Sequence, residues 1–149
     1  MPDPTVSPHY LGEQGAQYAK WQLGIAGAMG AINARKFGRF VTPEDTVLDF
    51  GCGGGFTLLV LQCARRLGVD PSAAALKVAR DNGIEAFASV SAVIPAVDVV
   101  ISNHALEHTT RPLDELRSIR AILKPTGRLV FSIGAVVALI EAREQPQSN

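Results

Sequence analysis

Residues 47–55 read Val-Leu-Asp-Phe-Gly-Cys-Gly-Gly-Gly, an apolar run that breaks into an acidic, glycine-rich turn. Asp49, Gly51, Gly53 and Gly55 occupy the four fixed positions of the pattern D-x-G-x-G-x-G. Glycine tolerates positive φ and lets a ligand lie directly on the backbone. A glycine turn between a buried strand and a helix is therefore expected to seat a nucleotide-like cofactor. The alternative is an ordinary strand-to-helix turn with surplus glycines.

Two other glycine-rich cofactor turns do not fit this stretch. The dinucleotide fingerprint G-x-G-x-x-G fails because Phe56 stands at the sixth position counted from Gly51. A P-loop fails because no Lys-Ser or Lys-Thr pair follows the glycines. What remains is the carboxylate of Asp49, two residues before the first glycine. A negative charge there repels a pyrophosphate and suits a cofactor that carries an ammonium or sulfonium group.

Composition is consistent with one globular domain spanning residues 1–149, of which 47% are hydrophobic and 19% charged. The 14 basic and 14 acidic residues balance, so the charge indicates neither a nucleic-acid partner nor an anionic membrane surface. Two cysteines, Cys52 and Cys63, are too few for a disulfide framework. Neither a signal pattern nor a membrane-length apolar run is found. We therefore expect a cytoplasmic protein.

Strand and helix patterns alternate along the chain at the spacing of βαβ units. We expect a loose segment at 1–12, a helical cap at 13–40 that breaks near Gly24, Gly27 and Gly30, a βαβ core at 46–133 and a polar tail at 144–149. The strands are expected at 46–50, 66–69, 84–87, 97–102 and 128–133. The core helices are expected at 56–61, from an N-cap at Ser72 to a stop at Gly83, and from Pro112, with a turn at 124–127 and a short helix at 134–143. The predicted fold class is α/β, a doubly wound, mostly parallel sheet with helices on both faces.

In such a sheet, ligands bind at the carboxyl ends of the strands. Asp49 ends the first strand, and Asp70 ends the second, where an acid can accept hydrogen bonds from ribose hydroxyls. The alternative for Asp70 is a turn aspartate before Pro71. Residues 103–108 follow the fourth strand and read Asn-His-Ala-Leu-Glu-His.

Residues 104–108 also match H-x-x-E-H, the inverted zinc-protease pattern. A zinc site would need a third protein ligand, and the downstream candidates are Glu141 and Glu144, near or in the polar tail. The segment also follows a predicted strand and does not sit within a long helix. We therefore expect no metal. A second alternative treats His104 as a cap or a packed side chain.

The segments 47–55, 68–71, 98–108 and 123–133 together resemble the cofactor-binding core of the class I S-adenosylmethionine (SAM) dependent methyltransferases. The resemblance covers residues 13–134 and is closest to the small-molecule methyltransferases with N-x-x-x-E-H after strand four. It implies a Rossmann-like fold, SAM as cofactor and methyl transfer to a small-molecule acceptor. The helix around Tyr18, Trp21 and Gln22 is similar to the segment that covers the cofactor, or else it packs on the sheet as an amphipathic helix.

The resemblance also implies roles for individual residues. Those placed at the cofactor are Asp49, Gly51, Cys52 and Gly53 at the methionine part, Asp70 and Pro71 at the ribose, Ser89 at the adenine, and Asn103. His108 would face the acceptor, with His104 beside the cofactor. If the acceptor is a hydroxyl or an acidic carbon, His108 and then His104 are the candidate general bases.

The C-terminal part departs from the family pattern. The family's sheet continues past strand five with two further strands, the last of them antiparallel, whereas this sequence predicts only the short helix at 134–143. Strand five would then lie at, or next to, an open sheet edge, which favours pairing with another copy. The alternative function is a shortened, catalytically impaired SAM-binding protein that acts as an oligomeric or regulatory partner.

Overall fold

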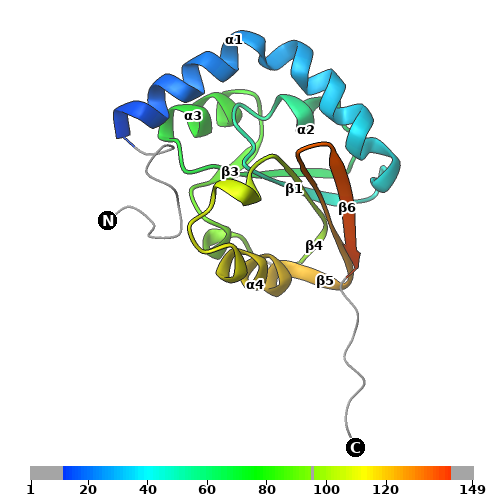
Figure 1. Cartoon of the computed structure of the whole chain (residues 1–149). Helices are drawn as coiled ribbons and strands as arrows, with labels where there is room; N and C mark the ends of the chain where they lie inside the picture. Colours follow the sequence, from blue (N-terminus) through cyan, green and yellow to red (C-terminus); the bar gives the residue numbers. More distant parts are fainter. Residues whose placement is uncertain (1–11, 95, 142–149) are drawn as a thin grey trace, which may run out of the picture.

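A single sheet forms the centre of the protein in the computed structural model, which describes residues 12–94 and 96–141, without the side chains at 15, 18–24, 26 and 136. Six strands lie in the order β3-β2-β1-β4-β5-β6 (Figure 1). Their bounds are β1 Thr46–Phe50, β2 Arg65–Val69, β3 Glu85–Phe87, β4 Val97–Asn103, β5 Leu123–Ile133 and β6 Val136–Glu141. The first five are parallel and β6 is antiparallel to β5. Strand order reverses between β1 and β4, so the expected ligand crevice lies there.

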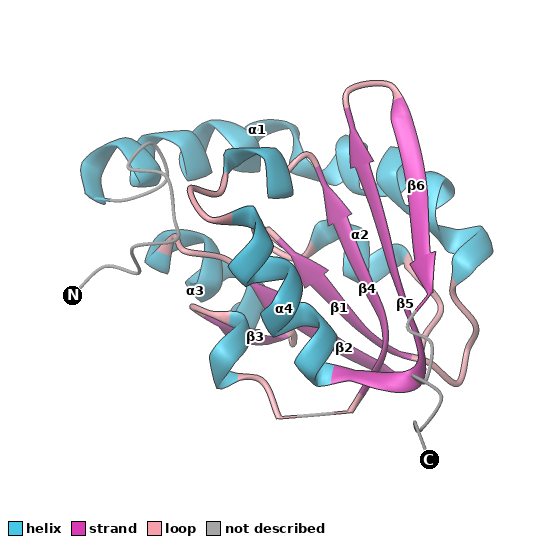
Figure 2. Cartoon of the chain, turned by 60° about the horizontal axis from the view of Figure 1, so that its bottom comes forward, coloured by secondary structure: helices cyan, strands magenta, loops and turns pink. Residues whose placement is uncertain are grey.

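Helices cover both faces of the sheet (Figure 2). Their bounds are α1 Gly12–Phe37, α2 Phe56–Val60, α3 Ala73–Asp81 and α4 Pro112–Ile122, with 3₁₀ turns η2 Gly38–Phe40, η3 Val90–Ala92 and η4 Leu106–His108. One buried cluster joins Phe37, Leu58 and Leu76 of α1, α2 and α3 to one face. A second joins Ile119 of α4 and Leu106 to the other face. Because both faces of the sheet are buried, the strands are apolar along most of their length. The same packing holds in place the strand ends at which the site lies.

Helix α1 is continuous over 26 residues, so the break expected at its glycines is wrong. Gly30 shows why a glycine is favourable inside this helix. A Cβ at Gly30 would lie 2.9 Å from both the carbonyl carbon and the carbonyl oxygen of Phe56, at the start of α2. The missing side chain therefore lets α1 rest directly on the α2 backbone, and this packing outweighs the low helix propensity of glycine.

The substitution Gly30→Ala is expected to lower the free energy of unfolding by about 1–3 kcal/mol, because the backbone of α2 cannot yield to the new methyl group. Gly27→Ala is the matched control, since nothing lies within 4 Å of a Cβ at that position. This control should stabilise α1 by about 0.5–1 kcal/mol. Thermal and urea unfolding measure both. Equal effects of the two substitutions would contradict the packing explanation.

The short helix expected at 134–143 is wrong, because residues Val136–Glu141 form strand β6. Ile133 pairs with Val136, so Gly134 and Ala135 make a two-residue hairpin loop. Gly134 takes the positive φ of 57° that such a loop requires. Strand β5 therefore has neighbours on both sides and lies next to the open edge of the sheet, which β6 forms.

The turn expected at 124–127 is part of an irregular β5. Val97 pairs with Leu123 and Val99 with Arg128, so the intervening residues bulge out of the ladder. Asp98 faces this bulge, where its carboxylate contacts Lys124 Nζ at 2.9 Å and accepts a hydrogen bond from the Thr46 N–H at 2.8 Å. Asp98 thus has a structural role at the opposite end of the sheet from the site.

Candidate active site

The glycine-rich loop after β1 closes against the end of β2. The N–H groups of Gly51 and Cys52 both donate to the carbonyl oxygen of Val69, at 2.8 and 3.0 Å. Gly51, Gly53 and Gly55 have φ values of 82°, 53° and 82°. This is the left-handed region that favours glycine. Glycine at these three positions therefore allows the loop to adopt its positive φ angles.

Two carboxylates lie beside this loop. Asp49 is 5% exposed at the end of β1. Asp70 accepts one hydrogen bond from the Gly53 N–H at 3.0 Å and another from the Ser72 N–H at 2.9 Å. The turn role expected as an alternative for Asp70 is therefore present, and the same carboxylate also holds the glycine loop.

Burial, and next the charge of Asp70, raise the pKa of Asp49 from 3.8 to about 7. Burial also raises the pKa of Asp70, against the lowering effect of its hydrogen bonds from Ser72 and Gly53. The negative charge of Asp70 disfavours the charged form of Asp49 in this low-dielectric surrounding. A cation that enters the loop relieves that repulsion. The charge and the shape of the loop thus fit a ligand with an ammonium or sulfonium group.

Cys52, Pro71 and Ser89 lie around the same edge of the sheet. Cys52 is buried, and its Sγ donates to the carbonyl of Gly53 at 3.3 Å. Burial, and then the charges of Asp49 and Asp70, raise its pKa well above the ordinary value, so it stays a thiol. Ser89 follows β3, and its hydroxyl lies 2.8 Å from that of Ser91. Pro71 directly follows Asp70 and is half-buried.

Asn103 is the last residue of β4, His104 follows it, and both contact Ser132 near the end of β5. The Asn103 Oδ1 accepts a hydrogen bond from the Ser132 hydroxyl at 2.8 Å. The His104 N–H donates to the Ser132 carbonyl at 3.0 Å, and His104 has a φ of 52°, the one positive value among the described non-glycine residues. This strained backbone turns the chain out of β4 toward the solvent. The backbone bond to β5 therefore fixes the position of His104, and its side chain is exposed and does not belong to the core.

The structure adds residues that sequence reasoning missed. Lys36 reaches from α1 to Asn103 Oδ1, with its Nζ at 2.7 Å, and to the Ser132 hydroxyl at 3.4 Å. Asn82, at the end of α3, donates to the carbonyl of Gly54 at 3.0 Å and so holds the glycine loop from behind. No local motif marks these contacts, since they join residues far apart in sequence.

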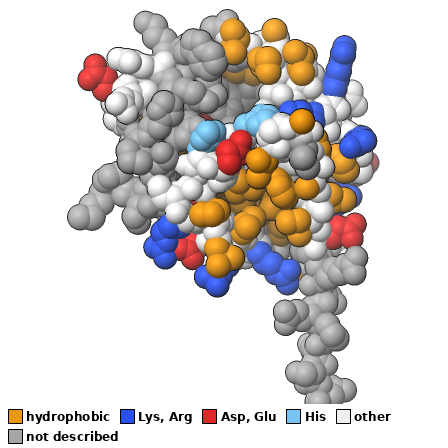
Figure 3. All heavy atoms as spheres, in the orientation of Figure 1, with side chains coloured by type: hydrophobic (Ala, Val, Ile, Leu, Met, Phe, Trp, Pro, Cys, Tyr) orange, Lys and Arg blue, Asp and Glu red, His pale blue; other side chains and the backbone are white. Residues whose placement is uncertain are grey.

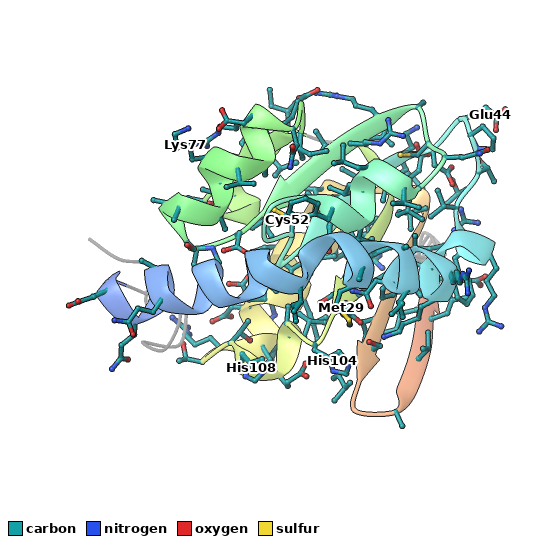
Figure 4. All side chains as sticks on the ribbon, turned by 90° about the horizontal axis from the view of Figure 1, so that it is seen from above. Met29, Glu44, Cys52, Lys77, His104 and His108 are labelled. Carbon is teal, nitrogen blue, oxygen red and sulfur yellow. The ribbon has the colours of Figure 1, made fainter. Side chains whose placement is uncertain are left out.

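The two histidines lie on the same side of α1 as Met29, while Cys52 lies on the other side when the molecule is seen from above (Figure 4). The His104 Nδ1 lies 3.4 Å from a carboxylate oxygen of Glu107. Residues Leu106–His108 form only a 3₁₀ turn, so His104 and His108 do not share a helix face as the zinc-protease pattern requires. The described residues contain no group of three or more His, Cys, Asp or Glu side chains placed to hold a metal ion.

The glycine loop follows β1, and the segment with the two histidines follows β4. Because β1 and β4 are neighbouring parallel strands, both segments lie at the same end of the sheet.

Some of the predicted residues are not described. The side chains of Tyr18, Trp21 and Gln22 lie outside the described residues, although their backbone belongs to α1. The predicted tail at 144–149 and most of the segment at 1–12 also lie outside them. None of the described helices is long and apolar enough to cross a bilayer.

Comparison with known proteins gives a consistent result. Residues 48–131, more than half of the chain, match the methyltransferase domain family. The chain is 37% identical over 106 residues to a ubiquinone biosynthesis O-methyltransferase of Histophilus somni, covering 60% of this chain and 44% of that protein. A protein of the same name from Alkalilimnicola ehrlichii is 31% identical over 123 residues, covering 72% and 45%. The chain thus spans less than half the length of these curated relatives.

Solved structures share the fold. A methyltransferase in complex with the Haloferax volcanii Trm112 activator superposes with a TM-score of 0.65 at 25% identity, covering 78% of this chain and 57% of that one. The plantazolicin methyltransferase BamL, solved with S-adenosylhomocysteine (SAH), has a TM-score of 0.65 at 18% identity, covering 83% and 52%. The family match, the parallel sheet and the acidic glycine loop agree. The chain belongs to the methyltransferase domain family, within the class I SAM-dependent methyltransferase superfamily.

Proposed function

We propose that this chain binds SAM at the acidic glycine loop and directs its methyl group to a small-molecule acceptor. The observation that carries the proposal is the buried carboxylate of Asp49 beside a loop whose glycines have positive φ. Asp49, Gly51, Cys52 and Gly53 would surround the methionine part. Asp70 and Pro71 would lie at the ribose, Ser89 at the adenine and Asn103 beside the cofactor.

When bound, SAM supplies an electrophilic methyl group, so the protein's tasks are to align the acceptor and exclude water. His108, and next His104, would accept the proton of a hydroxyl acceptor. An oxygen acceptor is proposed because the two relatives compared above are named O-methyltransferases. The test is formation of SAH from SAM with a panel of phenols. If the chain binds SAM but forms SAH no faster than the protein-free control, the proposed turnover is contradicted.

Binding of SAM is expected to depend on pH. The pKa of Asp49 is about 7, so below that pH a bound cation must displace its proton. As the pH increases toward 7, the affinity for SAM should therefore increase by up to about tenfold per pH unit, and above pH 7 it should level off. The α-ammonium group of SAM stays charged until about pH 8. Calorimetric titration between about pH 5.5 and 7.5 measures the slope. Asp49→Asn should remove it, and a slope that persists in this variant would assign the effect elsewhere.

A second candidate is a SAM-binding subunit whose turnover needs a partner. It is supported by the open edge of β6 and by the solved structure in which a methyltransferase is paired with an activator. Pairing with a second copy through this sheet edge is a further proposal of the same kind. SAM binding without SAH formation by the isolated chain would favour this candidate. We also propose a cytoplasmic location, because Cys52 and Cys63 are free thiols.

A further inference from the structure

One face of α1 carries apolar side chains that the core does not use. Ile25, Met29, Ile32 and Lys36 follow one another at intervals of four, three and four residues, so they form one stripe along the helix. Ile25, Met29 and Ile32 are 47%, 39% and 56% exposed. We call these three residues the apolar stripe. The core side of the helix is a different one, marked by the buried Ala34 and Phe37.

The apolar stripe faces the end of the sheet at which the two histidines lie. Met29 lies on the same side of α1 as His104 and His108 (Figure 4). In the space-filling view, hydrophobic side chains gather along α1 above the two histidines, with a hollow between them (Figure 3). The stripe is therefore placed to contact a molecule that lies between α1 and the histidines.

Lys36, a half-buried residue, ends this stripe. Its hydrogen-bond partners, Asn103 and Ser132, are neutral and already bond to each other at 2.8 Å. Among the residues that the structure describes, Lys36 makes no ion pair with a carboxylate. A partly buried charge without a counter-ion is costly. The site would gain free energy from an anion that reaches Lys36.

The two ends of the site therefore differ in charge. Asp49 and Asp70 make the cofactor end acidic, whereas Lys36 makes the end at β4 and β5 basic. We propose that the methyl acceptor is an apolar small molecule with an oxyanion, a carboxylate or a phenolate. Its apolar body lies on the stripe of α1, and its oxyanion binds Lys36 beside Asn103 and Ser132. This inference deepens the proposed function and rests on it.

The test uses pairs of one anionic and one neutral aromatic probe, titrated into the SAH-saturated protein. Each pair shares one aromatic body and differs in its polar group, which is anionic in one member and neutral in the other: 2-naphthoate with 2-naphthamide, and 4-nitrophenolate with 4-nitroanisole. The wild type should bind at least one anion about tenfold tighter than its neutral partner, since a charge-assisted hydrogen bond replaces a neutral one. The pair with the preference identifies the oxyanion as carboxylate or phenolate.

Two variants separate the charge from the apolar stripe. Lys36→Met should abolish the anion preference and leave the neutral probes bound as before. Ile32→Asn should weaken both members of a pair by the same factor. Lys77→Met is the control, because Lys77 is exposed and pairs with Asp81 on α3. Asn103 Oδ1 keeps the Ser132 hydroxyl as donor in Lys36→Met, so this variant should fold. If its thermal transition is lost, Lys36→Gln replaces it.

An anion preference that is absent in the wild type, or unchanged in a folded Lys36→Met, overturns the inference. A fall in melting temperature without a change in preference would also overturn it, since Lys36 would then only attach α1 to the sheet. SAH affinity is measured in parallel. Loss of SAH binding by the wild type would contradict the proposed function, whereas SAH binding without an anion preference contradicts this inference alone.

Discussion

Replacing Asp49 by asparagine is expected to weaken SAM binding by about 2–5 kcal/mol, a loss of roughly thirtyfold or more, at pH 8. The carboxylate is buried beside the glycine loop, and its pKa of about 7 means that it is charged at this pH. Asparagine keeps the shape and removes the charge that would face the cation. Calorimetric titration of SAM into each protein measures the difference.

The same variant should not unfold the protein. A raised pKa in the folded state means that ionising Asp49 costs stability, progressively between pH 3.8 and about 7. Asparagine never ionises, so the melting temperature at pH 8 should equal or exceed that of the wild type. Asp81→Asn is the matched control, since Asp81 is exposed on α3 and pairs with Lys77. Wild-type SAM affinity in Asp49→Asn would remove Asp49 from the site.

Gly51→Ala is expected to have the largest effect on stability. Gly51 has a φ of 82°, and a Cβ there would lie 2.6 Å from the Ala105 Cβ. A left-handed alanine costs about 1–2 kcal/mol, and the overpacking adds about 1–3 kcal/mol. The contact also pushes the glycine loop away from the segment after β4, so SAM binding should be lost together with stability.

Gly83→Ala separates the two contributions, because Gly83 has the same φ of 82° with nothing within 4 Å of a Cβ. This control should lose only the conformational part, about 1–2 kcal/mol, and keep its affinity for SAM. Urea unfolding and SAM titration compare the variants. If Gly51→Ala is no more destabilised than Gly83→Ala, the close approach of the loop to Ala105 is not a constraint.

The elements with local signals were predictable from the sequence. The apolar run before Asp49 and the glycines after it predict β1 and its loop, and the structure has β1 at Thr46–Phe50 as expected. Ser72 was predicted as an N-cap, and its side chain accepts from the Ala75 N–H. Such features depend on neighbours within a few residues, which a sequence displays directly.

The parts that were missed depend on contacts between distant residues. Lys36 meets Asn103 across 67 positions and Ser132 across 96, and no spacing in the sequence announces either contact. The continuous α1 was missed because its glycines read as helix breakers, while the contact of Gly30 with Phe56 is tertiary. The segment at 134–143 was predicted as a short helix, whereas pairing with β5 makes Val136–Glu141 a strand.

The most direct test of the account is a titration of the folded chain with four ligands at pH 8: SAM, SAH, NAD and ATP. The buried acid at the glycine loop should accept the ammonium-bearing ligands and repel phosphates. We expect SAM and SAH each to bind with a stoichiometry of one per chain, and the affinities for NAD and ATP to be at least about tenfold lower. No SAM binding by the folded chain, or NAD or ATP binding as tight as SAM, would contradict the account.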